Sequence, residues 1–250
     1  MARTARIKSK TGIYHIVLRG NNKQQIFLEE EDYKRLLDIV SDYSKSCDYS
    51  ILAYCLMGNH IHLLLKTGET ELAKIMKRIV VKFVYYYNTK YDRVGHLFQD
   101  RFKSEPVEND EYLLEVVRYI HQNPIKANIC YDVGEYEYSS YKQYVDKELS
   151  PIVDTSFILD IIPIYEFINF HKQIDKNINC IDIVEKIHSI GDKAALHLVY
   201  DILKKYNVQN LNEQPKEIQI KVARMCKENG LLIRQIVRLT GITKRIVELS

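Results

Sequence analysis

Two histidines stand one residue apart inside an otherwise apolar run, LMGNHIHLLLK, over residues 56–66. In a β-strand residues i and i+2 point to the same face, so His60 and His62 would lie side by side while Ile61 enters the core. Two neutral imidazoles aimed at one point can bind a metal ion. An isolated pair of this spacing also fits two histidines that merely line a groove, and taken alone it favours that interpretation.

A metal ion on this pair would need a further ligand. Neither a cysteine nor an HExxH motif provides it nearby, which argues against zinc. An oxygen donor added to two imidazoles makes Mn²⁺ or Mg²⁺ suitable, with positions open for water and a phosphate. The stretch EVVRYIHQNP, residues 115–124, offers Asn123 and, four residues earlier on the same helical face, Tyr119.

A phenol beside a bound cation is a nucleophile suited to cleaving a DNA strand through a phosphotyrosine. The same residues have a structural alternative: Tyr119 can be packing, and Asn123 before Pro124 is a common helix stop. His121 points to another side of this helix, where we interpret it as a surface or groove residue.

The elements that must position these residues follow from periodicity and capping signals. Strands are predicted over residues 13–19, 49–57, 60–66 and 102–107, and helices over about 29–47, 71–91 and 109–123. This order predicts an α+β fold, a ferredoxin-like split βαβ antiparallel sheet with helices, followed by an all-α C-terminal region. We expect three segments: 1–150 as the α+β domain, 151–215 as a helical connector or accessory region, and 216–250 as a tail.

The tail has the pattern of a helix-turn-helix. Helices are predicted over 217–230, 231–241 and 242–249, with Gly241 in the last turn. An ordinary helical hairpin fits the same pattern. The expected small core is Ile233, Ile236, Val237, Ile242, Ile246 and Val247, with Arg234, Arg238, Lys244 and Arg245 outside.

The charge distribution favours a polyanionic partner such as nucleic acid. The net charge is +3, yet the final thirty-five residues contain eight basic and three acidic side chains, and basic residues also cluster at positions 3–10. Solvated surface charge would look the same. Among nineteen tyrosines, the run Tyr85–Tyr87 suits packing or stacking on DNA.

The composition is that of a soluble globular protein, 46% apolar and 28% charged. The five cysteines are widely spaced without a CxxC pair, which favours reduced thiols rather than disulfides or a zinc ribbon. We expect no signal peptide, no membrane span and a cytoplasmic location.

Four blocks in order, RGNNKQQIF, CLMGNHIHLLLK, GHLFQDRFKSEPV and RYIHQNPIKAN, resemble the single-tyrosine HUH transposases, specifically the REP-associated tyrosine transposase group. HUH denotes His, hydrophobe, His, here His60-Ile61-His62. The resemblance covers roughly residues 5–145, and the basic tail resembles one carried by some longer members. Two features depart from the family: many members have Pro where Gly58 stands, and the tail stops at Ser250, within or just after its third helix.

The resemblance implies a metal-dependent nuclease domain that cuts and rejoins single-stranded DNA, usually beside a hairpin, through a covalent 5′-phosphotyrosine. It implies Tyr119 as the nucleophile and a divalent cation, Mg²⁺ or Mn²⁺, on His60, His62 and Asn123. No GxxxxGK[ST] loop occurs, in keeping with a reaction that needs no nucleotide cofactor.

The expected partner is single-stranded DNA with a hairpin, with duplex DNA as a second candidate on the tail, and the protein is expected to be a monomer or homodimer. Two other functions remain open: a domesticated DNA-binding protein that no longer cuts, and a helix-turn-helix regulator. The basic residues expected at DNA are Arg3, Arg6, Arg19, Arg101, Lys103, Arg234, Arg238, Lys244 and Arg245.

Overall fold

The computed structural model describes residues 6–146, 149, 152–173, 180, 192–206, 208, 210–229, 231 and 233–249. The chain divides into two compact units, Met1–Ile183 and Val184–Ser250, and each is described by itself. Within the described part, no helix is both long and apolar enough to cross a bilayer.

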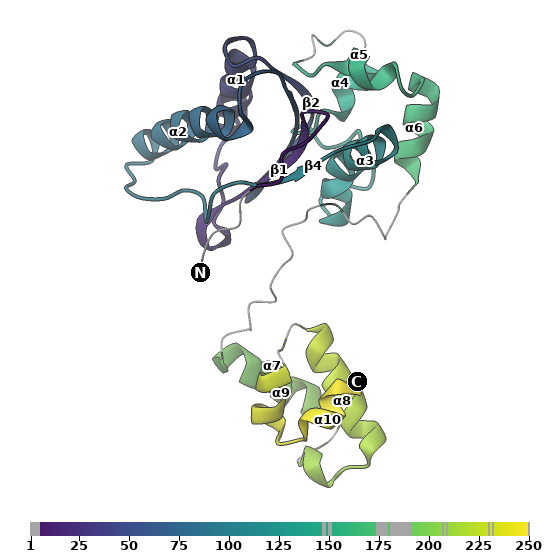
Figure 1. The fold of residues 1–250 in the computed structure, drawn as a ribbon. Coiled ribbons are helices and arrows are strands. Elements are labelled where there is room, and N and C mark those ends of the chain that lie inside the picture. The colour runs from purple at the N-terminus through teal and green to yellow at the C-terminus, as the bar shows by residue number, and fades with distance from the viewer. Residues whose placement is uncertain are drawn as a thin grey trace. The chain divides into compact units, whose positions relative to one another are not determined.

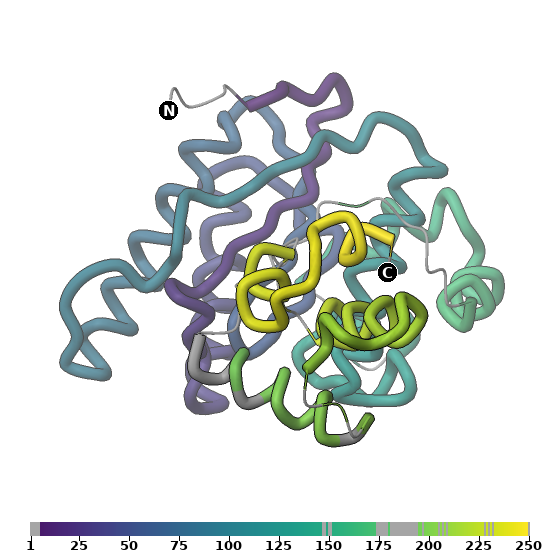
Figure 2. The backbone as a smooth tube through the Cα atoms, turned by 90° about the horizontal axis from the view of Figure 1, so that it is seen from below, coloured from purple at the N-terminus to yellow at the C-terminus, as the bar shows by residue number. Residues whose placement is uncertain are grey.

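The first unit is built on a four-stranded antiparallel sheet in the order β2-β3-β1-β4. Its strands are β1 (Ile13–Arg19), β2 (Tyr49–Met57), β3 (His60–Thr67) and β4 (Lys103–Pro106). Figure 2 shows β1 in purple beside the teal segment that leads from α2 into β4, one of the two edge strands. This order is that of a ferredoxin-like sheet, so the predicted fold class is confirmed.

Three long helices cover the two faces of this sheet. Helices α1 (Glu30–Ser46) and α2 (Leu72–Lys90) pack together on one face, and α3 (Asp110–Lys126) lies on the other (Figure 1). Capping fixes where they begin: Glu29 and Asp32 form a capping box on α1, and the Asn109 side chain accepts from the Tyr112 backbone N–H at 2.8 Å on α3.

Helix α3 does not stop before Pro124, as the sequence suggests, but continues to Lys126. Proline lacks the N–H that would donate to the Ile120 carbonyl. The Asn123 side chain provides donors in its place, with Nδ2 2.9 Å from the Tyr119 carbonyl oxygen and 3.5 Å from that of Ile120. The helix therefore tolerates Pro124 near its end.

Short helices complete the first unit: η1 (Asn21–Lys23), α4 (Tyr141–Val145), α5 (Thr155–Leu159) and α6 (Ile164–Lys172). Apolar side chains of α5 and α6, such as Ile158 and Phe167, are fully buried in the same core as the sheet. This part of the expected connector therefore packs as a piece of the first unit.

The second unit has its own apolar core. It comprises α7 (Asp192–Lys205), η2 (Leu211–Glu213), α8 (Lys216–Glu228), α9 (Ile233–Thr240) and α10 (Lys244–Glu248). Helix α7 contributes Ala195, Val199 and Ile202 to that core, so the two units do not follow the expected boundaries at 150 and 215. The boundary between the units depends on which apolar helix faces pack together. Composition alone does not show this.

The last three helices lie close to their predicted positions. Gly241 turns the chain between α9 and α10 with a φ of 74°, a conformation that favours glycine. Ile236, Ile242 and Val247 are buried in the second core, and the other three predicted core residues, Ile233, Val237 and Ile246, are partly buried against it.

Candidate active site

The two histidines of the HIH motif lie on the face of the sheet that α3 covers. In the β1–β3 ladder His62 lies opposite Val17 and His60 opposite Arg19, so these side chains share one face. By the same alternation His15 belongs to this face too. The register therefore brings a third imidazole to the pair.

His62 is fully buried and contacts His15 directly. Its Nδ1 atom lies 3.0 Å from His15 Nε2, and the two rings stack with centroids 5.3 Å apart. Burial is the main cause that lowers the pKa of His62 well below its usual value, with added repulsion from His15, His60 and Lys126. Burial also lowers the pKa of His15 to about 3. Both rings are thus neutral, the form that binds metal ions.

His60 begins β3 and is partly exposed. Its Nδ1 lies 2.7 Å from the Asn59 side-chain oxygen, an acceptor, so this nitrogen carries the proton and Nε2 carries the lone pair in the neutral ring. The ring meets His62 edge-on, with centroids 5.2 Å apart.

Tyr119 comes to this cluster from α3. Its ring centroid is 5.8 Å from those of both His62 and His15, and the residue is only 3% exposed. Further along the same helix, Lys126 places its ammonium 3.9 Å from the Tyr119 ring centroid. A cation at this distance favours negative charge on the phenol.

Asn123 lies one turn from Tyr119 and is 8% exposed. Its Nδ2 atom donates to two carbonyl oxygens of its own helix, and the amide oxygen is the atom of this side chain able to bind a cation. Asn123 is thus not the helix stop expected as an alternative, because α3 continues to Lys126, and its bonds within the helix are compatible with a ligand role.

These donors fit a divalent cation. The Nε2 atom of His62 is buried and has no hydrogen-bond partner within the described residues. If Nδ1 donates to His15, then Nε2 presents a lone pair, which is the usual arrangement of a metal-binding histidine held by a second residue. No three His, Cys, Asp or Glu side chains of the described part converge as a metal-binding group, and the Asn123 amide oxygen is the candidate for a third protein ligand.

His121 was expected at the surface or in a groove, and this is wrong: it is fully buried. The Phe167 carbonyl can only accept, so His171 Nδ1 donates to it at 2.8 Å, and in the neutral rings His171 Nε2 then accepts from His121 Nδ1 at 2.9 Å. His121 Nε2 in turn accepts from Ser140 Oγ at 2.7 Å. The chain of bonds fastens α3 to α6, which the sequence does not reveal.

The remaining basic residues expected at DNA are dispersed. Arg19 and Lys103 share the sheet face of His62, whereas Arg6 lies over the Phe102 ring at 3.7 Å, near Arg101. Burial, and then the charge of Arg101, lower the pKa of Arg6. Arg3 lies outside the described residues. The four basic residues predicted in the tail lie on α9 and α10 and are exposed: Arg234, Arg238, Lys244 and Arg245.

Two residues of the site escape sequence reasoning. His15 stands in a strand of alternating character, but only the pairing of β1 with β3 shows that it faces His62. Lys126 follows the proline at which the helix was expected to end. Its spacing of seven from Tyr119 would have placed it on the same face, had the helix been continued past residue 124.

Comparisons with known proteins find similar sequences. The family model described as IS200-like transposase matches residues 8–123. A protein of Haemophilus influenzae, provisionally named a REP-associated tyrosine transposase, is 26% identical over 158 residues, 57% of this chain and 87% of its own length. The REP-associated tyrosine transposase of Escherichia coli K12 is 23% identical over 148 residues, 58% of this chain and 85% of its own.

A solved structure has the same fold. It is described as a REP-associated tyrosine transposase bound to a REP hairpin, and it matches 61% of this chain and 90% of its own with a TM-score of 0.52 and 20% identity. The resemblance and the fold inferred from the sequence are both confirmed.

Proposed function

Residues 8–123 belong to the IS200-like transposase family, a class of enzymes, and from this premise we propose that the protein cuts and rejoins single-stranded DNA beside a hairpin through a covalent bond to Tyr119. The observation that supports this most directly is the approach of the Tyr119 ring to His62, with centroids 5.8 Å apart within one chain. A nucleophile and a pair of ligand-type imidazoles are thereby brought to one place.

In the proposed reaction the Tyr119 oxygen attacks a phosphorus of the DNA backbone. A Tyr–O–P bond forms, the phenol proton leaves, and the bond from phosphorus to the 3′ oxygen breaks. That oxygen takes a proton and becomes a free 3′-OH, while the 5′ phosphate stays on the tyrosine. Attack by a 3′-OH reverses the step, and because the ester conserves the bond energy, no nucleotide is consumed.

The protein's own residues prepare this step. The Lys126 ammonium, 3.9 Å from the Tyr119 ring centroid, offsets the charge that develops on the phenol oxygen. His15 fixes the orientation of His62. A divalent cation, Mg²⁺ or Mn²⁺, held by His60 and His62 with the Asn123 amide oxygen, would supply Lewis acidity at a phosphate oxygen.

The choice of a hairpin substrate rests on the relatives. One solved structure of the same fold is described as bound to a REP hairpin. Both curated relatives are matched over more than four fifths of their length, so the compared region contains nearly all of them. We propose the same class of substrate for this chain.

The proposal is tested with labelled single-stranded hairpin oligonucleotides, Mn²⁺ or Mg²⁺, and a denaturing gel for a covalent adduct. Tyr119→Phe should bind DNA and form no adduct, because only the attacking oxygen is removed. Tyr112→Phe is the matched control: Tyr112 lies on the same helix, about two turns before Tyr119, and should keep the adduct. DNA mapped by mass spectrometry to any other tyrosine would contradict the assignment.

A second function is favoured by the basic residues that α9 and α10 present at their surface. They suit duplex DNA, either beside the cleaved strand or as the only ligand of a protein that no longer cuts. Binding of DNA by the wild-type chain without any metal-dependent adduct, across a panel of hairpins, would favour this alternative.

A further inference from the structure

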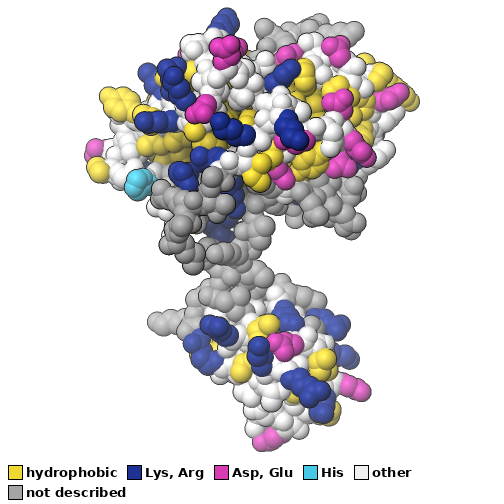
Figure 3. Space-filling model, viewed as in Figure 1, with side chains coloured by type: hydrophobic (Ala, Val, Ile, Leu, Met, Phe, Trp, Pro, Cys, Tyr) yellow, Lys and Arg dark blue, Asp and Glu magenta, His cyan; other side chains and the backbone are white. Residues whose placement is uncertain are grey.

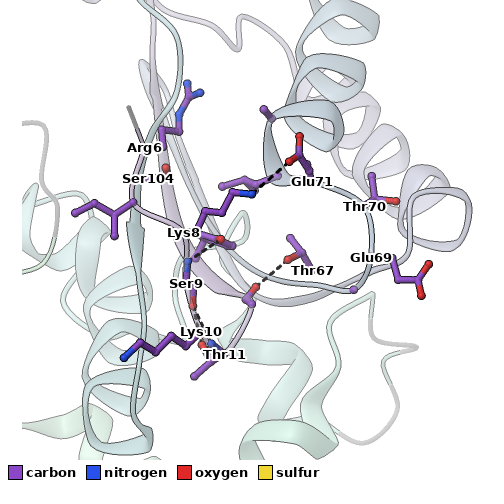
Figure 4. A pocket seen from close by; sticks show the side chains of 16 residues that line it. Arg6, Lys8, Ser9, Lys10, Thr11, Thr67, Glu69, Thr70, Glu71 and Ser104 are labelled. Atoms are coloured by element: carbon purple, nitrogen blue, oxygen red, sulfur yellow. Dashed lines mark hydrogen bonds and ion pairs between the residues drawn. The ribbon is translucent and has the colours of Figure 1, made fainter. Parts of the chain in front are cut away.

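Three hollows follow one another along α2, on the face of the sheet opposite Tyr119. The first, of about 500 Å³, lies between residues 6–12, the loop 67–71 and Ser104 (Figure 4). The second, of about 330 Å³, shares Arg6 and Ala73 with the first. The third, of about 510 Å³, shares Lys77 and Val81 with the second, and the three neighbouring hollows together are called the α2 groove.

The third hollow is strongly basic. Its lining includes Lys74, Lys77, Arg78 and Lys82 and contains no acidic side chain. Among the described residues, no carboxylate forms an ion pair with Lys74, Lys77 or Lys82. Figure 3 shows Lys and Arg side chains gathered over α1 and α2. A cluster of positive charge of this kind suits the backbone of a nucleic acid.

Large apolar side chains are exposed among these cations. Tyr85 is 72% and Val81 59% exposed, although both stand on a helix whose other side is well buried. The partly buried Tyr43 lines the same hollow. Exposed aromatic rings between basic residues are the arrangement on which unpaired bases stack.

The groove reaches β4, one of the two edge strands of the sheet. In β4, Lys103 faces the side of His62, since it lies opposite Val17. Its neighbour Phe102 points to the other side, where it lines the second hollow with Arg6. Because β4 is an edge strand, a DNA strand can pass around it from one face to the other.

The first hollow continues this path at the N-terminal side of α2. Figure 4 shows Lys8 reaching across it to Glu71, with the ammonium 3.6 Å from the carboxylate. Both side chains are highly exposed, so the pair contributes little and a phosphate can displace the carboxylate.

We propose that the α2 groove binds single-stranded DNA that continues beyond the nucleotides held at Tyr119. The inference rests on the proposed function, because it assumes that the substrate is single-stranded. The lysines contact phosphates, and Tyr85 stacks on a base. A longer substrate would then be bound more tightly, without a change in the chemistry.

Binding is measured by fluorescence anisotropy with a labelled oligothymidine of about thirty nucleotides, which forms no hairpin, and the full-length chain. The groove variant is Lys74→Gln/Lys77→Gln/Lys82→Gln. Its matched control, Lys34→Gln/Lys142→Gln/Lys172→Gln, removes the same charge from positions outside the groove. The groove variant should bind oligothymidine at least about tenfold more weakly. The slope of log affinity against log salt concentration should be smaller in magnitude by about 2, since each lost phosphate contact removes roughly 0.7 from it. Equal binding by the two triple variants would overturn the proposal.

Stacking is tested at Tyr85. Tyr85→Ala should weaken binding about tenfold, whereas Tyr85→Phe, which keeps the ring, should bind as the wild type does. If Tyr85→Ala also binds as the wild type does, the stacking role is wrong.

Cleavage assays separate this inference from the proposed function. On hairpin oligonucleotides with short single-stranded flanks, the groove variant should form adduct as the wild type does. Long flanks should increase adduct formation by the wild type, and they should not increase it for the groove variant. A wild-type chain that forms no adduct, yet binds oligothymidine through the groove, contradicts the proposed function alone. Normal cleavage with a groove variant that retains the full benefit of long flanks contradicts the groove alone.

Discussion

His15 and His62 lie on neighbouring strands with His15 Nε2 3.0 Å from His62 Nδ1, and both rings are fully buried. A buried imidazole that binds a cation through one nitrogen needs a partner for the other, which fixes its tautomer and its orientation. His15 is therefore a positioning residue for the proposed cation site, although it need not touch the cation.

The first prediction concerns this hydrogen bond. His15→Leu should raise the Mn²⁺ concentration needed for half-maximal adduct formation by about 10- to 100-fold, since His62 would have no partner to hold its ring. His15→Gln, which can still accept or donate, should recover part of this effect. His96→Ala is the control, because His96 is exposed, and should change nothing. An unchanged Mn²⁺ dependence in His15→Leu would remove His15 from the site.

Asn123 allows its two roles to be separated, which gives the second prediction. The amide nitrogen donates to the Tyr119 carbonyl at 2.9 Å, while the oxygen is the proposed ligand. Asn123→Asp removes the donor and keeps an oxygen, whereas Asn123→Ala removes both. Each should lower the free energy of unfolding by about 1 kcal/mol, but only Asn123→Ala should abolish metal-dependent adduct formation. If Asn123→Ala forms adduct at the wild-type rate, Asn123 only bonds carbonyls of its own helix and is no ligand.

The features of the site that could be predicted from the sequence are those that a local residue pattern determines. Alternation in a β-rich run placed His60 and His62 on one face, and helical spacing placed Tyr119 beside Asn123. His15 could not be found in this way, because its partner depends on the register between strands, and the two histidines are 47 positions apart in the chain. A shift of one residue would have turned it to the other face.

His121 was misplaced for a related reason. Helical periodicity gives the direction of a side chain relative to its neighbours, but burial depends on what packs against that side. Here α6 covers it, from a segment whose Ile- and Leu-rich sequence indicated packing without indicating a partner.

The third prediction follows from the histidine pair of α3 and α6. Burial is the main cause that lowers the pKa of His171 to about 4, and it lowers the pKa of His121 well below its usual value. The unfolded chain, with histidine pKa values near ~6.5, binds these protons first. The contribution of this histidine pair to the free energy of unfolding is therefore complete above about pH 6.5. It decreases as the pH falls toward 4, by up to about 1.4 kcal/mol per pH unit for each histidine.

Hydrogen exchange followed by mass spectrometry checks this prediction. Between about pH 7 and pH 5, opening of residues 110–126 and 164–172 should become easier, after correction for the intrinsic exchange rate. His171→Gln should flatten this dependence, since the amide can take over hydrogen bonds but does not titrate. His96→Gln, at an exposed position, should leave it unchanged. Equal pH dependence in all three proteins would argue against the pair.

The last prediction concerns the second unit. Because α7 shares the core of α8, α9 and α10, removal of residues 216–250 alone would expose the apolar side of α7, so the test uses point variants in the full chain. The variant replaces four basic residues that are absent from that core, Arg234, Arg238, Lys244 and Arg245, by Gln. It should bind duplex DNA more weakly. The slope of log affinity against log salt concentration should be smaller in magnitude by about 0.9 for each phosphate that is no longer bound.

Adduct formation by this variant on a saturating single-stranded hairpin should stay at the wild-type level, because none of the four residues lies in the unit that carries Tyr119. Duplex binding equal to that of the wild type would show that these helices are an ordinary hairpin. A fall in adduct formation at saturation would instead show that the second unit takes part in cleavage.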